Sequence, residues 1–482
     1  MNAWFWVFIS YIVLNTLLLL AMIFLERRKL SSVISWLTIL TFLPGVGFII
    51  YLIFGSGLSW RVKRLIRKHK LYTVEYDESL QSAFSISQTA KKNLLQDEST
   101  IKCCYNYGSA LCPNNKINFL TSGQIVIENI LKDIENAKES INVEYYIFAN
   151  DKVGKKVMNA LIKKAKEGVK VKLIYDSIGS LKAPRRFFRK LKKAGGGVAE
   201  FFPPFMHIRL VNMKLNYRNH RKIIVIDGRI GYTGGVNIRD DHMGLKKKVS
   251  PWRDTHLRIE GTGVYALQNI FLNDWRYVKN ENLDTKDYVA AGYFPKLEKK
   301  DDAFVQVLAS GPDSNVQTIK EVYVKLITNA KSEICIQTPY FIPDETFMAA
   351  LRIALASGVK VKIMVPYKPD YKFVYWATLS YLKDMADLGA NIYFYDGFVH
   401  AKTLMIDDNK ISVGTCNIDN RSFGLNFEDT VLIYDKECVE DYREIFKQDL
   451  NNCVEVDSNY FKKKKSLNKF AQAFFRLFSA IF

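Results

Sequence analysis

The chain has 482 residues, enough for two or three domains, and its 48% hydrophobic content is sufficient for sizeable cores. Its 69 Lys and Arg outnumber 49 Asp and Glu, so the net charge of +20 predicts a polyanionic partner, either nucleic acid or an anionic lipid surface. The seven cysteines include no CxxC pair, which argues against a disulfide framework and favours reduced thiols in a cytosolic domain.

Two apolar runs open the chain, and each is long enough to span a bilayer as a helix. Residues 3–25 carry no charge, and residues 31–58 form the second run after the charged segment 26–29. Pro44 and nearby glycines weaken the second helix, so one span with an interfacial segment is the alternative. A cleaved signal peptide is disfavoured because there is no basic start and no clear small-residue cleavage site.

The charges that flank the two runs predict their orientation. Residues 60–70 contain six Lys and Arg, whereas the loop between the runs contains three. Because the larger basic flank stays in the cytoplasm, we expect residues 1–70 to form a transmembrane helical hairpin with the rest of the chain cytoplasmic. Residues 71–98 are polar and poorly patterned, and we expect them to be a connector.

The chain after this connector repeats one series of elements, which indicates two similar domains. The matched segments are the strand patterns 141–148 and 334–341 and the GVKVK sequences at 168–172 and 358–362. Alternating helices and apolar strands predict α/β domains with a mixed, mostly parallel sheet flanked by helices. We expect the domains to cover residues 99–285 and 300–458 and to form a pseudo-two-fold pair.

The two halves differ most at an insertion in the first half. Residues 201–219 read FFPPFMHIRLVNMKLNYRN, whereas the second half crosses the same interval with only ANIYFYDGFV. Its apolar side chains Phe201, Phe202, Phe205 and Met206 lie beside basic residues, and we expect an exposed lip that touches lipid. The alternative is a surface loop whose aromatic side chains pack on the domain.

The pattern His-x-Lys-x4-Asp occurs twice at matched places, as HRKIIVID from His220 and as HAKTLMID from His400. A turn of small residues follows each copy, and then Asn237 or Asn417. The β-branched residues after Lys222 predict a strand, in which the His and the Lys point to the same side, and the Asp-Gly pair that ends it predicts a hairpin. One copy would be weak evidence, but two matched copies argue for a function.

Brought together across a pseudo-two-fold interface, the two copies supply two imidazoles, two ammonium groups and two amides, which suits a phosphoryl group. Lysines and amides hold and neutralise its non-bridging oxygens. One His can attack phosphorus and form a phosphohistidine, while the other protonates the leaving alkoxide and then deprotonates the incoming hydroxyl. Because the lysines replace a metal cation, and the six histidines are mostly isolated, we expect neither a metal nor another cofactor.

Acidic residues accompany each copy of the motif. Asp254 follows the first copy and Glu428 the second, and we expect each to hydrogen-bond a catalytic His, which fixes its tautomer and raises its basicity. The alternative for both is a buried structural acid. Asp227 and Asp407 end the two motifs near the turns, and we expect them to support the catalytic residues, with a purely structural role as the alternative.

The C-terminal residues 459–482 contain a second pattern that is typical of membrane-binding segments. Four lysines, 462–465, precede apolar residues that recur at three- and four-residue spacing from Leu467 to Ile481. This pattern predicts a basic amphipathic helix lying in an anionic membrane interface. The alternative is a helix that docks on the protein's own core.

The chain resembles the phospholipase D superfamily, whose mark is this duplicated HxKx4D with a following Gly-rich turn and Asn, and within it the bacterial cardiolipin synthases. The narrower resemblance depends on the hairpin sequence WLTILTFLPGVGFIIYLIFG at 36–55, the doubled domain and the basic, aromatic C-terminus. The end of the chain, FRLFSAIF, departs from the Ser-Pro-Leu-Leu-like ending common in such enzymes.

The resemblance implies the site residues. The catalytic set is His220, Lys222, Asp227, His400, Lys402 and Asp407, with His220 as the nucleophile, and the phosphate-binding or supporting set is Asn237, Asn417, Asp254 and Glu428. No metal belongs to the implied site.

The implied reaction transfers a phosphatidyl group from one phosphatidylglycerol to another and releases glycerol, at a bacterial cell membrane. The expected partners are phosphatidylglycerol and anionic membrane lipid, with no nucleic acid, and an oligomer is compatible with the sequence. A membrane-bound hydrolase or another phosphatidyltransferase would use the same groups and is the alternative. A nuclease fits the hairpin poorly, and a non-catalytic scaffold would be expected to have lost a His or Lys.

Overall fold

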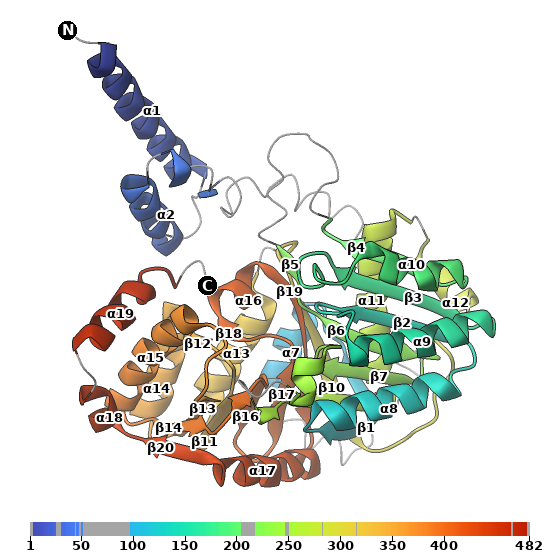
Figure 1. Cartoon of the computed structure of the whole chain (residues 1–482). Helices are drawn as coiled ribbons and strands as arrows, with labels where there is room; N and C mark the ends of the chain where they lie inside the picture. Colours follow the sequence, from blue (N-terminus) through green and yellow to red (C-terminus); the bar gives the residue numbers. More distant parts are fainter. Residues whose placement is uncertain are drawn as a thin grey trace.

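Figure 1 shows the computed structural model of the chain, in which two N-terminal helices stand apart from a body of two α/β halves. The structure describes residues 3–25, 30–43, 45–47, 50–51, 97–203, 217–245, 250–281, 283–314, 316–463 and 466–479. The basic flank at 60–70 and nearly all of the predicted connector lie outside these residues.

The two N-terminal apolar runs contain helices that pack on each other. Helix α1 (Ala3–Leu25) has 23 residues without a charge, and α2 (Leu30–Phe42) follows it. Trp36 and Tyr51 are buried with ring centroids 5.2 Å apart, and Leu19 of α1 packs against them. Counting only the residues that are fully described, no helix is long and apolar enough to cross a membrane.

The first half alternates strands and helices as the repeat predicts. Its elements are α7 (Glu98–Asn106), β1 (Leu111–Leu120), α8 (Gly123–Asn136), β2 (Ser140–Tyr145), α9 (Lys152–Lys166), β3 (Lys170–Asp176), α10 (Arg185–Lys193), β4 (Gly197–Phe201), β5 (Arg218–Asn219), β6 (Lys222–Ile226), β7 (Ile230–Gly234), the 3-10 helix η4 (Asp240–Met243), β8 (Trp252–Arg253), β9 (His256–Glu260), α11 (Gly263–Lys279) and α12 (Thr285–Ala290). Ser122 and Asp151 start α8 and α9 by accepting a backbone N–H of the first turn.

The second half repeats this order and adds elements at its end. Its elements are β10 (Ala303–Ser310), α13 (Thr318–Asn329), β11 (Glu333–Gln337), β12 (Phe341–Ile342), α14 (Glu345–Ala356), β13 (Lys360–Pro366), α15 (Lys372–Asp387), β14 (Asn391–Tyr395), β15 (Phe398–Val399), β16 (Thr403–Ile406), β17 (Lys410–Gly414), β18 (Ile418–Asp419), α16 (Asn420–Gly424), β19 (Asn426–Tyr434), α17 (Lys436–Leu450), β20 (Cys453–Val456), α18 (Ser458–Lys462) and α19 (Ser466–Arg476). Asp344 and Asp435 cap α14 and α17 in the same way.

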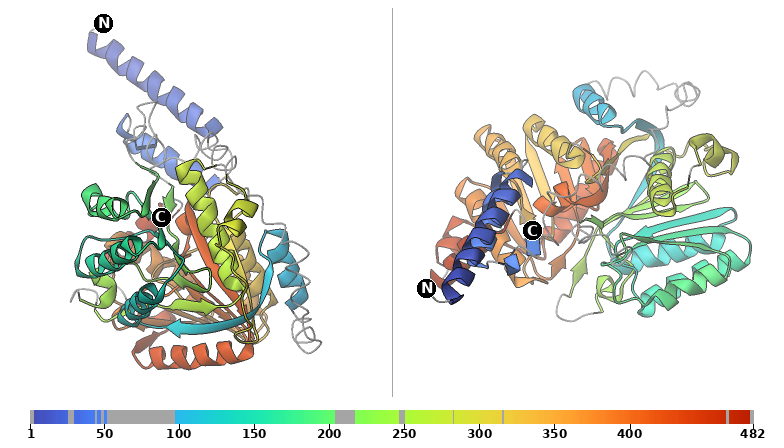
Figure 2. Two further views of the ribbon diagram at one scale, coloured as in Figure 1. Left: turned by 90° about the vertical axis from the view of Figure 1, so that its right-hand side faces the viewer. Right: turned by 90° about the horizontal axis from the view of Figure 1, so that it is seen from above.

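Among the described residues, one 16-stranded sheet runs through both halves. Its order is β20-β14-β13-β11-β16-β17-β19-β10-β1-β9-β7-β6-β2-β3-β4, with β5 attached to β19. The halves meet where β1 pairs with β10, and the strands on the two sides of this junction mirror each other in order. Figure 2 shows helices on both faces of the sheet.

The prediction of a mostly parallel sheet is wrong, because most neighbouring strands in the described part of the sheet are antiparallel. Parallel pairing within the main sheet joins β2 to β3, β3 to β4, β11 to β13 and β13 to β14, and attaches β5 to β19. The motif strands β6 and β16 instead enter hairpins and run antiparallel to their neighbours. A tight turn joins only antiparallel strands, whereas the βαβ units on the outer sides give parallel ones.

The two halves share a hydrophobic core as well as a sheet. One buried cluster includes Ile223 and Leu257 from the first half together with Val305, Val413 and Val431 from the second. Each half has a further cluster of its own between its helices and its strands. The two motif-bearing strands are therefore anchored in one continuous interior.

The described ends of the insertion and the C-terminal helix both pack on the body. Phe201 and Phe202 are only 0% and 2% exposed, so the prediction that they lie on an exposed lip is wrong. Their rings contact Phe427 from the other half, which buries them. Phe205 and Met206 lie outside the described residues.

Helix α19 docks on α15 through one face. Arg476 forms an ion pair with Asp384 at 2.6 Å, and its guanidinium lies 4.4 Å from the centre of the Tyr381 ring. The helix still leaves Phe470 and Phe474 exposed on the surface. It therefore has both a docked face and an unpaired aromatic face.

Candidate active site

The first motif places His220 against a strand of the other half. Strand β5 pairs in parallel with the start of β19, and the His220 backbone N–H donates to the Phe427 carbonyl at 2.9 Å. The next residue of β19 is Glu428, whose two carboxylate oxygens each lie 2.9 Å from His220 Nδ1. Thr415 and Asn426 donate to the same carboxylate, at 2.6 and 3.1 Å, which fixes its orientation.

The second motif repeats this arrangement with the halves exchanged. Strand β8 of the first half pairs in parallel with β15, and the His400 backbone N–H donates to the Arg253 carbonyl at 2.6 Å. Asp254 Oδ2 lies 2.8 Å from His400 Nδ1, and the Trp252 indole N–H donates to the same oxygen at 3.3 Å. Each half therefore contributes the His of one pair and the acid of the other.

Close backbone approach makes the second pair possible. A Cβ added at Gly235 would lie 1.9 Å from Asp254 Oδ1 and 2.8 Å from the His400 carbonyl oxygen. Only glycine leaves room for the acid and the histidine at this point. Gly235, which follows the first motif, thus has a packing role at the interface of the halves.

The two motif lysines are buried beside the histidines. Lys222 Nζ donates to the His220 carbonyl at 2.7 Å, and Lys402 Nζ to the His400 carbonyl at 2.6 Å. Burial lowers the pKa of Lys222 to about 8 and that of Lys402 to about 7. Burial, together with the charges of Lys222 and Lys402, holds the pKa of His220 well below its usual value, so a lysine from each motif acts on one imidazole.

The acids of the two pairs differ in charge. Burial raises the pKa of Glu428 to about 7. Burial alone also raises the pKa of Asp254, but His400 and His242 outweigh it and hold that pKa well below its usual range. At neutral pH the carboxylate beside His400 is ionised, whereas the one beside His220 is near its midpoint.

The two motif asparagines hydrogen-bond other protein groups beside the catalytic centre, which is the buried cluster of the motif histidines and lysines with their acids. Asn237 Oδ1 accepts from the Ile147 backbone N–H at 3.2 Å, and its Nδ2 lies 3.3 Å from His242 Nε2. Asn417 is 7% exposed, and its side chain hydrogen-bonds that of Asp419. Each amide group has two N–H donors, so both can still donate to a bound oxyanion.

The structure does not bring Asp227 and Asp407 to the histidines, because each lies at the far end of its motif strand. Asp227 accepts from the backbone N–H groups of Lys138, Glu139 and Ser140 at 2.8–2.9 Å. Asp407 accepts from the matching residues 331–333. Both carboxylates tie the turn after the motif strand to the start of the neighbouring strand.

We expect Asp227→Asn to lower the free energy of unfolding by about 1–3 kcal/mol, because it removes the charge from three backbone hydrogen bonds. Asn tolerates the positive φ of 51° at this position, so backbone strain is not added. Urea unfolding followed by circular dichroism measures the effect. A loss of activity as large as that of a His220 variant, without a loss of stability, would contradict the structural role.

His242 and Trp252 belong to the centre although neither was predicted. The His242 ring lies 5.0 Å from the His400 ring and 4.1 Å from that of Trp252. Ligand atoms of His242, Asp254 and His400 lie within 4.8 Å of one another, a spacing at which a metal ion could be held. Asp254 and His400 already hydrogen-bond each other, and the three residues come from separate segments, so no local motif in the sequence reveals the group.

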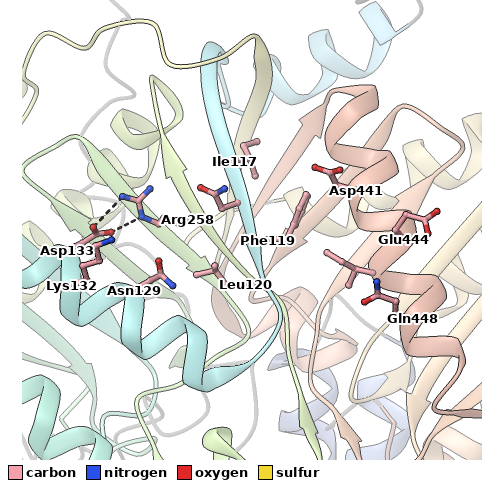
Figure 3. Close-up of a pocket in the computed structure, with 12 residues that line it drawn as sticks. Ile117, Phe119, Leu120, Asn129, Lys132, Asp133, Arg258, Asp441, Glu444 and Gln448 are labelled. Atoms are coloured by element: carbon pink, nitrogen blue, oxygen red, sulfur yellow. Dashed lines mark hydrogen bonds and ion pairs between the residues drawn. The ribbon is translucent and has the colours of Figure 1, made fainter.

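The centre is distinct from a surface cleft of about 690 Å³ that lies between β1 and α17. Figure 3 shows Arg258 bound to Asp133 on one side of this cleft and Asp441 and Glu444 on the other. No residue of either motif lines it. Its mixed charges do not resemble the basic, imidazole-bearing centre.

Comparisons with known proteins agree with this geometry. Residues 130–275 and 323–450 match the family "Cardiolipin synthase, PLD-like domain", and residues 13–56 match the family "Phospholipase D-nuclease N-terminal". The chain is 43% identical over 450 residues to the major cardiolipin synthase ClsA of Bacillus subtilis (strain 168), across 91% of each chain. It is 41% identical over 478 residues to a cardiolipin synthase of Listeria monocytogenes serotype 4a (strain HCC23), across 98% of each chain.

A solved structure has the same fold at low sequence identity. The phosphatidylserine synthase of Haemophilus influenzae Rd KW20 superimposes with a TM-score of 0.60 at 18% identity, over 80% of this chain and 98% of that one.

Proposed function

The chain belongs to the cardiolipin synthase family of phospholipase D-like proteins and is a phosphatidyltransferase, and from this premise we propose that it converts two phosphatidylglycerol molecules into cardiolipin and glycerol. The observation that carries the proposal is the pair of buried His–acid contacts, one from each motif. Both acids bind Nδ1, so Nε2 of each imidazole is left for the substrate. The proposed domains are residues 99–285 and 300–458.

In the proposed first step, His220 Nε2 attacks the phosphorus of one phosphatidylglycerol. A P–N bond forms, the bond from phosphorus to the head-group glycerol breaks, and His400 gives its proton to the departing oxygen. In the second step, His400 takes the proton from a primary hydroxyl of a second phosphatidylglycerol. That oxygen attacks phosphorus, the P–N bond breaks, and cardiolipin leaves with His220 restored.

Lys222, Lys402, Asn237 and Asn417 serve in this proposal as donors to the non-bridging phosphate oxygens. The two lysines are 0% and 2% exposed, and their charges act strongly in a centre from which most water is excluded. Exclusion of water also protects the phosphohistidine from hydrolysis to phosphatidic acid.

The proposal is tested with the purified full chain and phosphatidylglycerol labelled separately in its glycerol head group and in its acyl chains, with a chelator present. Cardiolipin with one free glycerol per molecule formed is the expected result. Phosphatidic acid and glycerol without cardiolipin would identify water as the acceptor and a hydrolase as the function. Activity that vanishes with the chelator and returns with added metal would contradict the proposed role of the lysines.

We expect kcat/KM to follow a bell-shaped pH profile with its maximum near pH 7. Glu428, with a pKa of about 7, must lose its proton to hold the His220 imidazole, so activity falls at lower pH. Lys402 and Lys222, with pKa values of about 7 and 8, must keep theirs to bind phosphate, so activity falls at higher pH. Bound phosphate raises both lysine pKa values, and the alkaline limb of kcat should therefore lie above that of kcat/KM.

For the membrane we propose that residues 1–70 span the bilayer as two helices, with the α/β halves on the cytoplasmic side, and that α19 rests on the same surface. The uncharged helix α1 and the exposed Phe470 and Phe474 on α19 support this arrangement. An enzyme held at the bilayer meets its lipid at high local concentration.

The double variant Phe470→Asp and Phe474→Asp is expected to raise the apparent KM for phosphatidylglycerol in mixed micelles by about 10-fold or more, because it removes two aromatic side chains from the lipid surface. The value of kcat should change little. Leu181→Asp, which alters an exposed apolar residue of the first half, is the matched control. Equal KM values for all three proteins would remove α19 from the lipid-binding surface.

A further inference from the structure

His242 is a buried imidazole that belongs to neither motif. It lies in η4, five residues beyond Asn237, and is 4% exposed. The position five residues beyond Asn417 in the second half is Ser422, which has no imidazole. No matching imidazole therefore stands at this position of the second half, and His242 packs on the side of His400.

The contacts of His242 link the first motif to the second His–acid pair. Its Nε2 lies 3.3 Å from Asn237 Nδ2, and its Nδ1 lies 3.7 Å from Asp254 Oδ2 and 3.2 Å from the Asn237 backbone nitrogen. The ring meets that of His400 edge-on, at 87°. Trp252 covers another side of His242 and donates its indole N–H to Asp254.

Asn237 contacts both nitrogens of the His242 ring. Asn237 Oδ1 accepts from the Ile147 N–H, so the other end of the amide presents its NH₂ to His242 Nε2. The backbone N–H of Asn237 donates to the other ring nitrogen, Nδ1, at 3.2 Å, so one asparagine contacts both nitrogens of the His242 ring. Burial lowers the pKa of His242 to about 4, so the ring is neutral at physiological pH.

We propose that His242 is a positioning residue for the Asp254–His400 pair, which it ties to the amide of Asn237. This inference rests on the proposed function, in which His400 transfers a proton twice in each turnover and must return to the same tautomer and orientation. His242 Nδ1 lies 3.7 Å from the carboxylate that holds His400, and the ring, held at both nitrogens by Asn237, blocks rotation of His400 from the side. His220, whose lone pair attacks once and is released, has Glu428 with Thr415 and Asn426 instead.

Two substitutions at this position separate positioning from packing. His242→Phe keeps a flat ring of similar shape against Trp252 but removes both nitrogens. His242→Gln loses the ring but keeps polar groups, namely an oxygen that can accept from an N–H of Asn237 and an amide N–H that can face Asp254. The full chain, its Phe variant and its Gln variant are assayed for cardiolipin formation from phosphatidylglycerol, and their unfolding midpoints are measured.

The expected result is a kcat lowered about 10–100-fold in His242→Phe with KM changed less than about threefold, and a kcat restored to within about fivefold of wild type in His242→Gln. A wild-type kcat in His242→Phe would overturn the inference. Equal losses of kcat in the two variants, in proportion to the fall in their unfolding midpoints, would also overturn it. A wild-type chain that releases glycerol but makes no cardiolipin would instead overturn the proposed function. The Phe and Gln variants could then still be compared by glycerol release, which keeps the two failures distinguishable.

Discussion

His220→Ala and His400→Ala are each expected to abolish cardiolipin formation, with kcat lowered by ~10⁴-fold or more. The first variant lacks the atom that forms the P–N bond, and the second lacks the group that moves the proton to and from the reacting oxygen. Both imidazoles are buried with their Nδ1 bound to acids of the opposite half, so neither can replace the other.

Isotope exchange separates the two roles. A covalent intermediate lets the enzyme incorporate labelled glycerol into phosphatidylglycerol, and His220→Ala should lose this exchange completely. His400→Ala should still release phenol from a substrate whose leaving group is a phenol of low pKa, because such a leaving group needs no proton. Exchange that survives in His220→Ala and disappears in His400→Ala would reverse the assignment of the nucleophile.

Circular dichroism and unfolding midpoints of both variants serve as controls for the fold. Asp227→Asn is the matched comparison within the same motif, since its carboxylate binds backbone N–H groups and lies away from His220. The expected order of activity is therefore wild type, Asp227→Asn and, far below both, the two His variants.

The motif hairpins could be predicted from local chemistry. The β-branched run after Lys222 forms β6, and Asp227 and Gly228 adopt φ values of 51° and 63°, as a two-residue hairpin turn requires. The two acids could also be identified from their positions after each motif. The signal for the hairpins lies within a few residues of the sequence, whereas each acid lies more than 20 residues beyond the end of its motif.

Features that depend on contact between the halves could not be predicted. Phe201 and Phe202 look exposed in the sequence because Phe427, which buries them, is more than 200 residues away. The exchange of acids between the pairs has the same origin, since it depends on the pairing of β5 with β19 and of β8 with β15. The repeat predicts two equal halves, and no local pattern indicates which half supports which His.

The antiparallel direction of most sheet strands could not be predicted, for a different reason. An apolar run indicates a buried strand but carries no information on the direction of its neighbours. The helices of the repeat predict parallel crossovers, and these occur at β2–β3 and β11–β13. The turns that follow the motifs reverse the chain, and the strands β9 and β19 return to the junction antiparallel to their neighbours.

Asp254→Asn is expected to lower kcat by about 10³–10⁴-fold, a larger loss than that of Glu428→Gln. An asparagine has nearly the same shape, but its NH₂ would face His400 Nδ1 and favour the tautomer that carries its proton on Nε2, which cannot act as a base. Asp254 is ionised at neutral pH and Glu428, with a pKa of about 7, is partly protonated, so a neutral amide changes the Asp254–His400 pair more than the Glu428–His220 pair.

A double-mutant cycle tests whether Asp254 acts through His400. In a His400→Ala background the acid has no imidazole to orient, and Asp254→Asn should then cost less than about threefold in the residual activity. In a His220→Ala background, Asp254→Asn should lower the residual activity by nearly the same factor as in the wild-type chain. Costs that are equal in both backgrounds would mean that Asp254 supports the fold of the interface, where Trp252 and Thr255 also donate to it, and not the chemistry of one histidine.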